Sequence, residues 1–150
     1  MNDERMRRIA LPLTITAGAY SANDVVGGLQ EIPIPRNAAG FIRGVEITDD
    51  DNEKAGLKLY LFTSRPTEFA DNAAFGATID DLKNLFAIIS IAAGDYSTIN
   101  GNAKAIVSTN TSLDFEVQNQ PVVFAYLVCD ATPTYAATTD LTVHVRLFLT

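Results

Sequence analysis

The sequence has few of the side chains on which enzyme active sites most often depend. It contains one histidine, His144, one cysteine, Cys129, and no tryptophan among 150 residues. Neither residue stands in a recognisable catalytic motif, and a general base also needs a nucleophile or an orienting carboxylate beside it. One cysteine cannot form an internal disulfide, and at the end of an apolar run it is interpreted as a buried, inert thiol. These scarcities favour a binding or assembly role over catalysis, with no cofactor.

Charge is also scarce, and most of it is negative. Charged residues make up 19% of the chain and the net charge is −7, whereas a typical globular domain has about 25% charged residues. The sequence lacks a basic stripe of the kind that binds nucleic acid by releasing counterions. It also lacks a run of 18 apolar residues, and its first residues do not form a secretory signal. We expect neither nucleic acid nor a membrane as a partner.

Several short segments alternate apolar and polar residues with a period of two, which is typical of half-buried β-strands. The clearest is 141–149, where leucine and valine face one way and residues such as His144 and Arg146 face the other. Segment 122–128 is apolar on both faces, which predicts a central strand covered on both sides. Further strands are predicted at 9–16, 29–35, 41–47, 57–63, 87–93, 105–108 and 113–117.

One short helix is predicted after Thr78, because Thr78 and Asp81 have the spacing of a capping box. The connections between the predicted strands are long. Hairpin loops of two to five residues would suit a meander, whereas long connections suit Greek-key crossings between two packed sheets. The sequence therefore predicts an all-β jelly-roll or Greek-key β-sandwich with one short helix, in a single domain over 9–150.

Residues 1–8 are polar and are predicted to form a flexible N-terminal arm. Arg5, Arg7 and Arg8 cluster in this arm and are candidates for contacts with an acidic partner, the alternative being a mobile terminus without a role. Pro33 and Pro35 cannot donate backbone hydrogen bonds, so they indicate an exposed sheet edge. We take both prolines as further candidate interface residues.

Tyr20, Tyr96 and Tyr135 lie in predicted loops and complete the set of candidate interface residues. Loop aromatics are typical of protein interfaces. They also form sugar-stacking platforms, and they plug the ends of β-sandwiches. All three interpretations stay open from the sequence.

The acidic run 49–53 offers a choice between a calcium site and a solvated turn. Calcium prefers clustered oxygen ligands, but the run lacks the ligand spacing of a helical calcium loop. The sequence therefore favours the turn.

The chain resembles small virion structural proteins of tailed bacteriophages, in particular the jelly-roll capsid decoration, or cement, proteins. The resemblance lies in the order and the general residue pattern of four segments: LPLTITAGAYSANDVVGGLQEIPIP, IRGVEITDDDNEKAGLKLYLF, RPTEFADNAAF and TYAATTDLTVHVRLFL. It covers residues 9 to 149 approximately, and no motif within it is diagnostic.

The resemblance implies a protein made in the host cytoplasm that sits on the outer surface of the capsid as a dimer or trimer. Its partners would be the major capsid protein, whose subunits it would bridge, and further copies of itself. Two alternatives stay open: a tail-associated or receptor-binding module of the same kind of particle, and a free-standing carbohydrate-binding β-sandwich. The absence of tryptophan disfavours the last of these.

Overall fold

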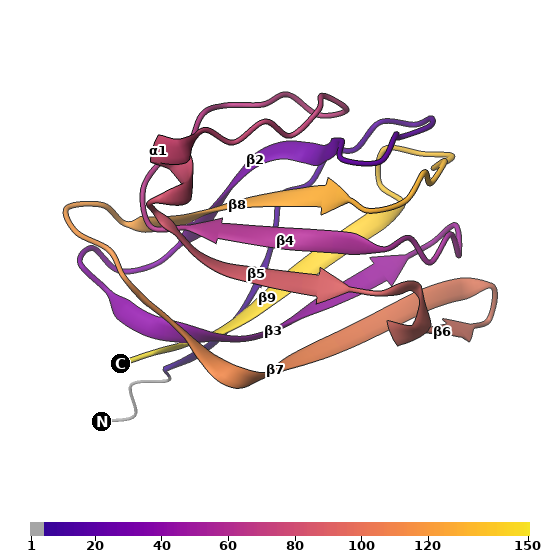
Figure 1. The fold of residues 1–150 in the computed structure, drawn as a ribbon. Coiled ribbons are helices and arrows are strands. Elements are labelled where there is room, and N and C mark those ends of the chain that lie inside the picture. Colours follow the sequence, from indigo (N-terminus) through magenta and orange to yellow (C-terminus); the bar gives the residue numbers. More distant parts are fainter. Residues whose placement is uncertain (1–4) are drawn as a thin grey trace.

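The computed structural model describes residues 5–150, apart from the side chains of residues 110–112, and consists of two packed antiparallel sheets (Figure 1). The five-stranded sheet has the order β1 (Met6–Ala10), β9 (Leu141–Leu149), β3 (Ala39–Asp49), β7 (Asn102–Glu116) and β6 (Tyr96–Ile99). The four-stranded sheet has the order β2 (Val25–Pro33), β8 (Val122–Cys129), β4 (Leu57–Phe62) and β5 (Leu85–Ile91). The predicted all-β sandwich is confirmed.

The strands pair as nested partners along the chain. β1 pairs with β9, β2 with β8, β3 with β7 and β4 with β5, and every pair is antiparallel. From β1 to β4 each successive strand lies in the opposite sheet, as do β7, β8 and β9 on the way back. This is the double Greek-key winding of a jelly roll. β6 is an added edge strand, and a turn at Asn100 and Gly101 joins it to β7 with φ angles of 50° and 80°.

The core lies between the two sheets and is formed by alternate residues of each strand. Leu57, Leu59 and Leu61 of β4 are fully buried, and so are Val143 and Val145 of β9. β8 is buried on both faces over most of its length, as predicted for 122–128, because it lies between β2 and β4 and is covered outside the sandwich as well. Burial of apolar side chains on this scale is the main stabilising contribution to the fold.

Segment 63–84 covers the outer face of the four-stranded sheet. It contains α1 (Ile79–Leu82), and Figure 1 shows it arching over β2 and β8. Phe69 and Phe75 of this segment pack on Tyr126 of β8, with ring centroids 5.7 and 5.4 Å from that of the tyrosine. The tyrosine hydroxyl accepts a hydrogen bond from the backbone amide of Phe69 and donates one to the carbonyl of Thr67. The outer side of this sheet is thus a second hydrophobic cluster.

The predicted capping box at the start of α1 is confirmed. The amide of Asp81 donates to the Thr78 hydroxyl at 3.2 Å, and the amide of Thr78 donates to the Asp81 carboxylate at 2.9 Å. The same carboxylate accepts the amide of Thr67 at 2.9 Å, so it ties both ends of the covering segment together. Over residues 5–150, no helix has the length and apolar character needed to cross a membrane.

The predicted N-terminal arm over 1–8 is wrong for residues 6–8, and the predicted strand over 9–16 is displaced. Residues 6–10 form β1, which pairs with β9, and residues 1–4 lie outside the described residues. The amide of Leu11 still donates to Val143, but Pro12 has no amide and the amide of Ile15 donates to the loop residue Thr138. The alternating residues beyond Ala10 therefore lie outside any strand.

The strands predicted at 105–108 and 113–117 are parts of one strand, β7. Its pairing with β3 shifts between Ile42 and Gly44, which is the position of a β-bulge. The shift explains why the alternation in the sequence breaks although the strand continues.

Candidate functional site

Tyr20, Tyr96 and Tyr135 do not face solvent, so their assignment to an exposed interface is wrong. All three rings are buried. Tyr20 and Tyr135 precede β2 and β9, and Tyr96 contacts Ala55 just before β4, so the rings lie at the end of the sandwich where β2, β4 and β9 begin. The rings of Tyr20 and Tyr135 meet edge to face at a centroid distance of 6.0 Å, and Tyr96 donates a hydrogen bond to the carbonyl of Ala55 at 2.9 Å. They plug the end of the sandwich and offer no stacking platform for a sugar.

Cys129 and the acidic run have structural roles. Cys129 is buried, which confirms the burial predicted from the sequence, and this burial raises the pKa of its thiol to about 12. The buried Asp49 carboxylate accepts the amides of Asp51 and Lys54 at 3.0 and 2.9 Å, so it organises the turn. No group of three or more histidine, cysteine or carboxylate side chains among the described residues is arranged to hold a metal ion. The predicted turn is present and is organised by Asp49.

The predicted edge residues Pro33 and Pro35 are exposed. Pro33 is the last residue of β2, which is an edge strand of the four-stranded sheet, so the predicted edge position is confirmed. Arg5 and Arg7 are also exposed, at the start of β1. A role of these four residues in an interface remains a prediction.

Arg8 belongs to a surface that is not predicted from the sequence. It lies on the outer face of the five-stranded sheet, where the described side chains form no hydrophobic cluster like the one under segment 63–84. Alternate residues of β9 enter the core, so His144, Arg146 and Phe148 point outward. We call the part of this surface around Glu46 the basic face and define it by Met6, Arg8, Phe41, Glu46, Lys104, Ile106, Ser108, His144, Arg146 and Phe148. The exposed Asp114 lies on the same outer surface opposite Phe41, beyond the cluster of cations.

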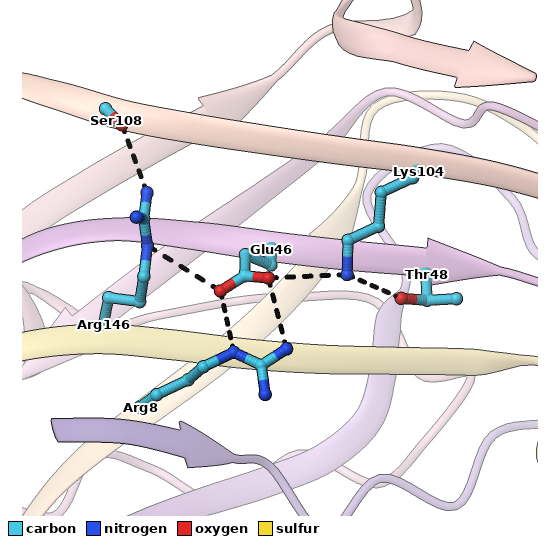
Figure 2. Close-up of polar contacts among 6 residues, drawn as sticks. All are labelled: Arg8, Glu46, Thr48, Lys104, Ser108 and Arg146. Carbon is cyan, nitrogen blue, oxygen red and sulfur yellow. Dashed lines mark hydrogen bonds and ion pairs between the residues drawn. The ribbon is translucent and has the colours of Figure 1, made fainter.

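Glu46 of β3 lies at the centre of the basic face, and three cationic side chains from three other strands converge on it (Figure 2). Arg8 of β1 binds it with two hydrogen bonds, Nε to Oε2 at 2.9 Å and Nη2 to Oε1 at 3.2 Å. The ammonium of Lys104 on β7 lies 3.4 Å from Oε1, and Nε of Arg146 on β9 lies 3.8 Å from Oε2. These contacts leave the Glu46 side chain 11% exposed.

Two hydroxyl groups fix the outer ends of this cluster. Lys104 donates to the Thr48 hydroxyl at 2.9 Å, and Nη2 of Arg146 donates to the Ser108 hydroxyl at 3.1 Å (Figure 2). Gly44 lies between Arg146 and Ser108 in the strand register. A Cβ at Gly44 would stand 2.9 Å from Nη2 of Arg146 and would collide with the carbonyl of Val107, so the glycine permits the arginine to cross β3.

The cluster holds its charges in fixed states near neutral pH. Hydrogen bonding from Arg8 lowers the pKa of Glu46 to about 2, and the same contact raises the pKa of Arg8. Burial lowers the pKa of His144, and the positive charge of Arg8 lowers it further. Glu46 is therefore an ionised partner for cations and a poor proton acceptor, because a general base is most effective when its pKa lies near the working pH.

Apolar side chains flank the charges. The rings of Phe41 and Phe148 stack with centroids 5.1 Å apart, and the guanidinium of Arg43 lies 5.2 Å from the Phe41 centroid. Met6 at one edge is 51% exposed and Ile106 beside Glu46 is 60% exposed. A surface that combines exposed apolar groups, aromatic rings and arginine is typical of protein interfaces.

Sequence reasoning identified Arg8 as a candidate but missed Glu46, Lys104, Ser108 and Arg146. The available signal was that Glu46, His144 and Arg146 are polar residues on strands whose other face is apolar. That pattern places each residue outside the core, but it does not say which strands are neighbours. No model of a known protein family matches the sequence, and no curated protein is significantly similar to it.

Proposed function

We propose that the protein is a virion structural protein that binds the outside of a phage capsid as a decoration, or cement, protein and bridges shell subunits. The observation that carries the proposal is the contrast between the two outer faces of the sandwich. The chain covers one with its own segment 63–84, whereas the other displays the ordered basic face. The resemblance of residues 9 to 149 to decoration proteins supports the same role.

A decoration protein acts through binding rather than through chemistry, and the basic face suits that requirement. Its cations are held by Glu46, so the surface is rigid before a partner arrives. On a symmetric shell each weak contact is repeated many times, and a dimer or trimer of the protein would engage several shell subunits at once. Avidity then supplies stability that no single interface needs to provide.

The edges of the sandwich offer a second means of attachment. β1 and β6 are the edge strands of the five-stranded sheet, and an edge strand presents unpaired backbone groups that can pair with a strand of another chain. Arg5 and Arg7 flank the β1 edge and would contact acidic groups beside it. Pro33 makes the end of the β2 edge a poor site for such pairing, because it has no amide to donate.

Reconstitution tests this function directly. Purified protein is mixed with heads that lack it, and the heads are sedimented and then heated while DNA release is followed. We expect the protein to sediment with the heads at saturation and to raise the temperature of DNA release. Failure to sediment with the heads would contradict the proposal.

A further inference from the structure

We infer that the basic face is a docking surface for an acidic protein surface, whose carboxylates bind between Arg8, Lys104 and Arg146. Three positive charges against the single negative charge of Glu46 leave this cluster with a net charge of +2, on a chain whose net charge is −7. The identity of the partner protein rests on the proposed function. The negative charge of the partner does not, because it is inferred from the cluster itself.

The cations of the cluster retain donors for a partner. A guanidinium has five N–H donors and an ammonium has three. Arg8 uses two of its five groups on Glu46, Arg146 has one short contact with Ser108, and Lys104 has one with Thr48. Nε of Arg146 is buried and is not among the donors available to a partner. The other remaining donors suit carboxylates, which arginine binds through two parallel hydrogen bonds.

Glu46 lowers the cost of binding by ordering these side chains in advance. Free lysine and arginine side chains lose considerable rotamer entropy when a partner immobilises them. Here the carboxylate holds Arg8 in a two-bond geometry, and Ser108 holds the far end of Arg146. The partner therefore meets donors that are already in place.

A second copy of the same face is a poor occupant. A twofold axis would bring the patch onto itself, and two clusters that each carry a net charge of +2 would then face one another. Like charges opposed across an interface are strongly unfavourable. The partner must instead supply an excess of carboxylates.

Nucleic acid is disfavoured by the surroundings of the cluster. Phosphate backbones are bound by extended arrays of cations, whereas this patch has a carboxylate at its centre and exposed Met6 and Ile106 at its flanks. The stacked rings of Phe41 and Phe148 are tied to each other and to the sheet. Apolar flanks beside a compact set of cations suit the mixed surface of a protein.

The test measures binding of a fluorescently labelled oligoglutamate peptide by anisotropy, at low and at physiological ionic strength. A single-stranded DNA oligonucleotide of equal charge serves as the second probe. The variant Lys104→Gln with Arg146→Gln removes two cations and leaves the Arg8–Glu46 pair intact. Its matched control is Arg36→Gln with Lys83→Gln, which removes two exposed cations that lie away from the face.

We expect the unmodified protein to bind the peptide at low ionic strength. The Lys104/Arg146 variant should lose roughly five- to tenfold in affinity, and the control should stay within about twofold. The variant Ile106→Lys adds a cation beside Glu46 and should bind more tightly, a gain that misfolding could not produce. Absence of peptide binding, equal losses in variant and control, or tighter binding of the DNA would each overturn the inference.

The peptide assay contains no phage component, so its outcome is separate from that of the proposed function. Binding to the peptide without binding to heads would support the inference that the partner is acidic. It would reject the proposal that this partner is a capsid protein. If the Lys104/Arg146 variant binds heads as tightly as the unmodified protein does, the capsid role is supported. The basic face is then rejected as the docking surface.

Discussion

At the residue scale, Glu46 shows how a carboxylate placed outside a core becomes buried by its partners. Its neighbours Val45 and Ile47 enter the core, which places Glu46 outward, as alternation in the sequence indicates. Its low exposure comes from Arg8, Lys104 and Arg146, which belong to three different strands. No local pattern in the sequence states that these strands are neighbours, so the cluster could not be predicted from it.

The first prediction concerns Glu46→Gln, which removes the negative charge that Arg8, Lys104 and Arg146 contact. Because the pKa of Glu46 is about 2 in the folded protein and its ordinary value is 4.5, the ionised group stabilises the fold above pH 4.5. That contribution is lost as the pH falls towards about 2. We expect the variant to lose about 2 kcal/mol in the free energy of unfolding at neutral pH, measured by chemical denaturation.

The pH dependence distinguishes this account from a loss of packing. The difference between Glu46→Gln and the unmodified protein should shrink below about pH 4. Glu31→Gln is the matched control, since Glu31 forms an exposed ion pair with Arg65 and should cost less than about 1 kcal/mol. A stability difference for Glu46→Gln that stays constant from neutral pH to about pH 2 would contradict the account.

The second prediction compares two buried tyrosines. The Tyr20 hydroxyl accepts the amide of Thr16 and donates to the Asp71 carboxylate, both at 2.7 Å, whereas the Tyr135 hydroxyl has no hydrogen-bond partner in the described residues. Tyr20→Phe should lower the free energy of unfolding by about 1–3 kcal/mol, because it leaves buried polar groups unpaired. Tyr135→Phe should be neutral or stabilising. Equal losses in thermal denaturation would argue against this assignment.

At the element scale, the sequence predicted best those elements whose evidence is local. Three features depend only on residues that are close together in the sequence: the alternation of β9, the burial of β8 on both faces and the capping box of α1. The N-terminal segment was harder, because alternation reports that a chain is extended and half-buried but not that it pairs with a strand. Residues 6–8 look like a polar arm in isolation and become a strand because β9 offers them an edge.

The third prediction concerns the segment 63–84 that covers the four-stranded sheet. Hydrogen bonds from Thr67 and Thr78 favour the charged form of Asp81 and lower its pKa despite its burial. Asp81→Ala should therefore cost about 1–2 kcal/mol and speed amide hydrogen exchange in 66–82 more than in the sheets. Asp80→Ala is the control, since the Asp80 side chain is exposed and pairs with the exposed Lys83. Uniform acceleration of exchange across the chain would show that the segment does not open separately.

At the scale of the whole molecule, long connections predicted a jelly roll, and the nested strand pairs confirm it. The distribution of charge over the surface could not be predicted, because a net charge of −7 conceals a patch of opposite sign. The loop tyrosines were misassigned for a related reason. The sequence places all three in predicted loops, although Tyr96 is the first residue of β6, and only the closed sandwich shows that their rings are buried at its end.

The fourth prediction separates self-association from docking. Because two basic faces repel each other, a twofold dimer should not form by pairing the basic face with itself, and we expect self-association through other surfaces. Arg146→Glu should leave the oligomeric state unchanged in size-exclusion chromatography with light scattering, and it should weaken binding to heads by tenfold or more. A change in oligomeric state with intact binding to heads would show that the basic face joins copies of the protein instead.

The central claim is that the protein decorates a capsid, and its copy number in purified virions tests that claim most directly. Quantitative mass spectrometry would measure the ratio of this chain to the major capsid protein. A ratio near that of the shell subunits is the expected result, because a decoration protein occupies repeated sites on the lattice. A handful of copies would indicate a tail-associated role, and complete absence from virions would contradict the claim.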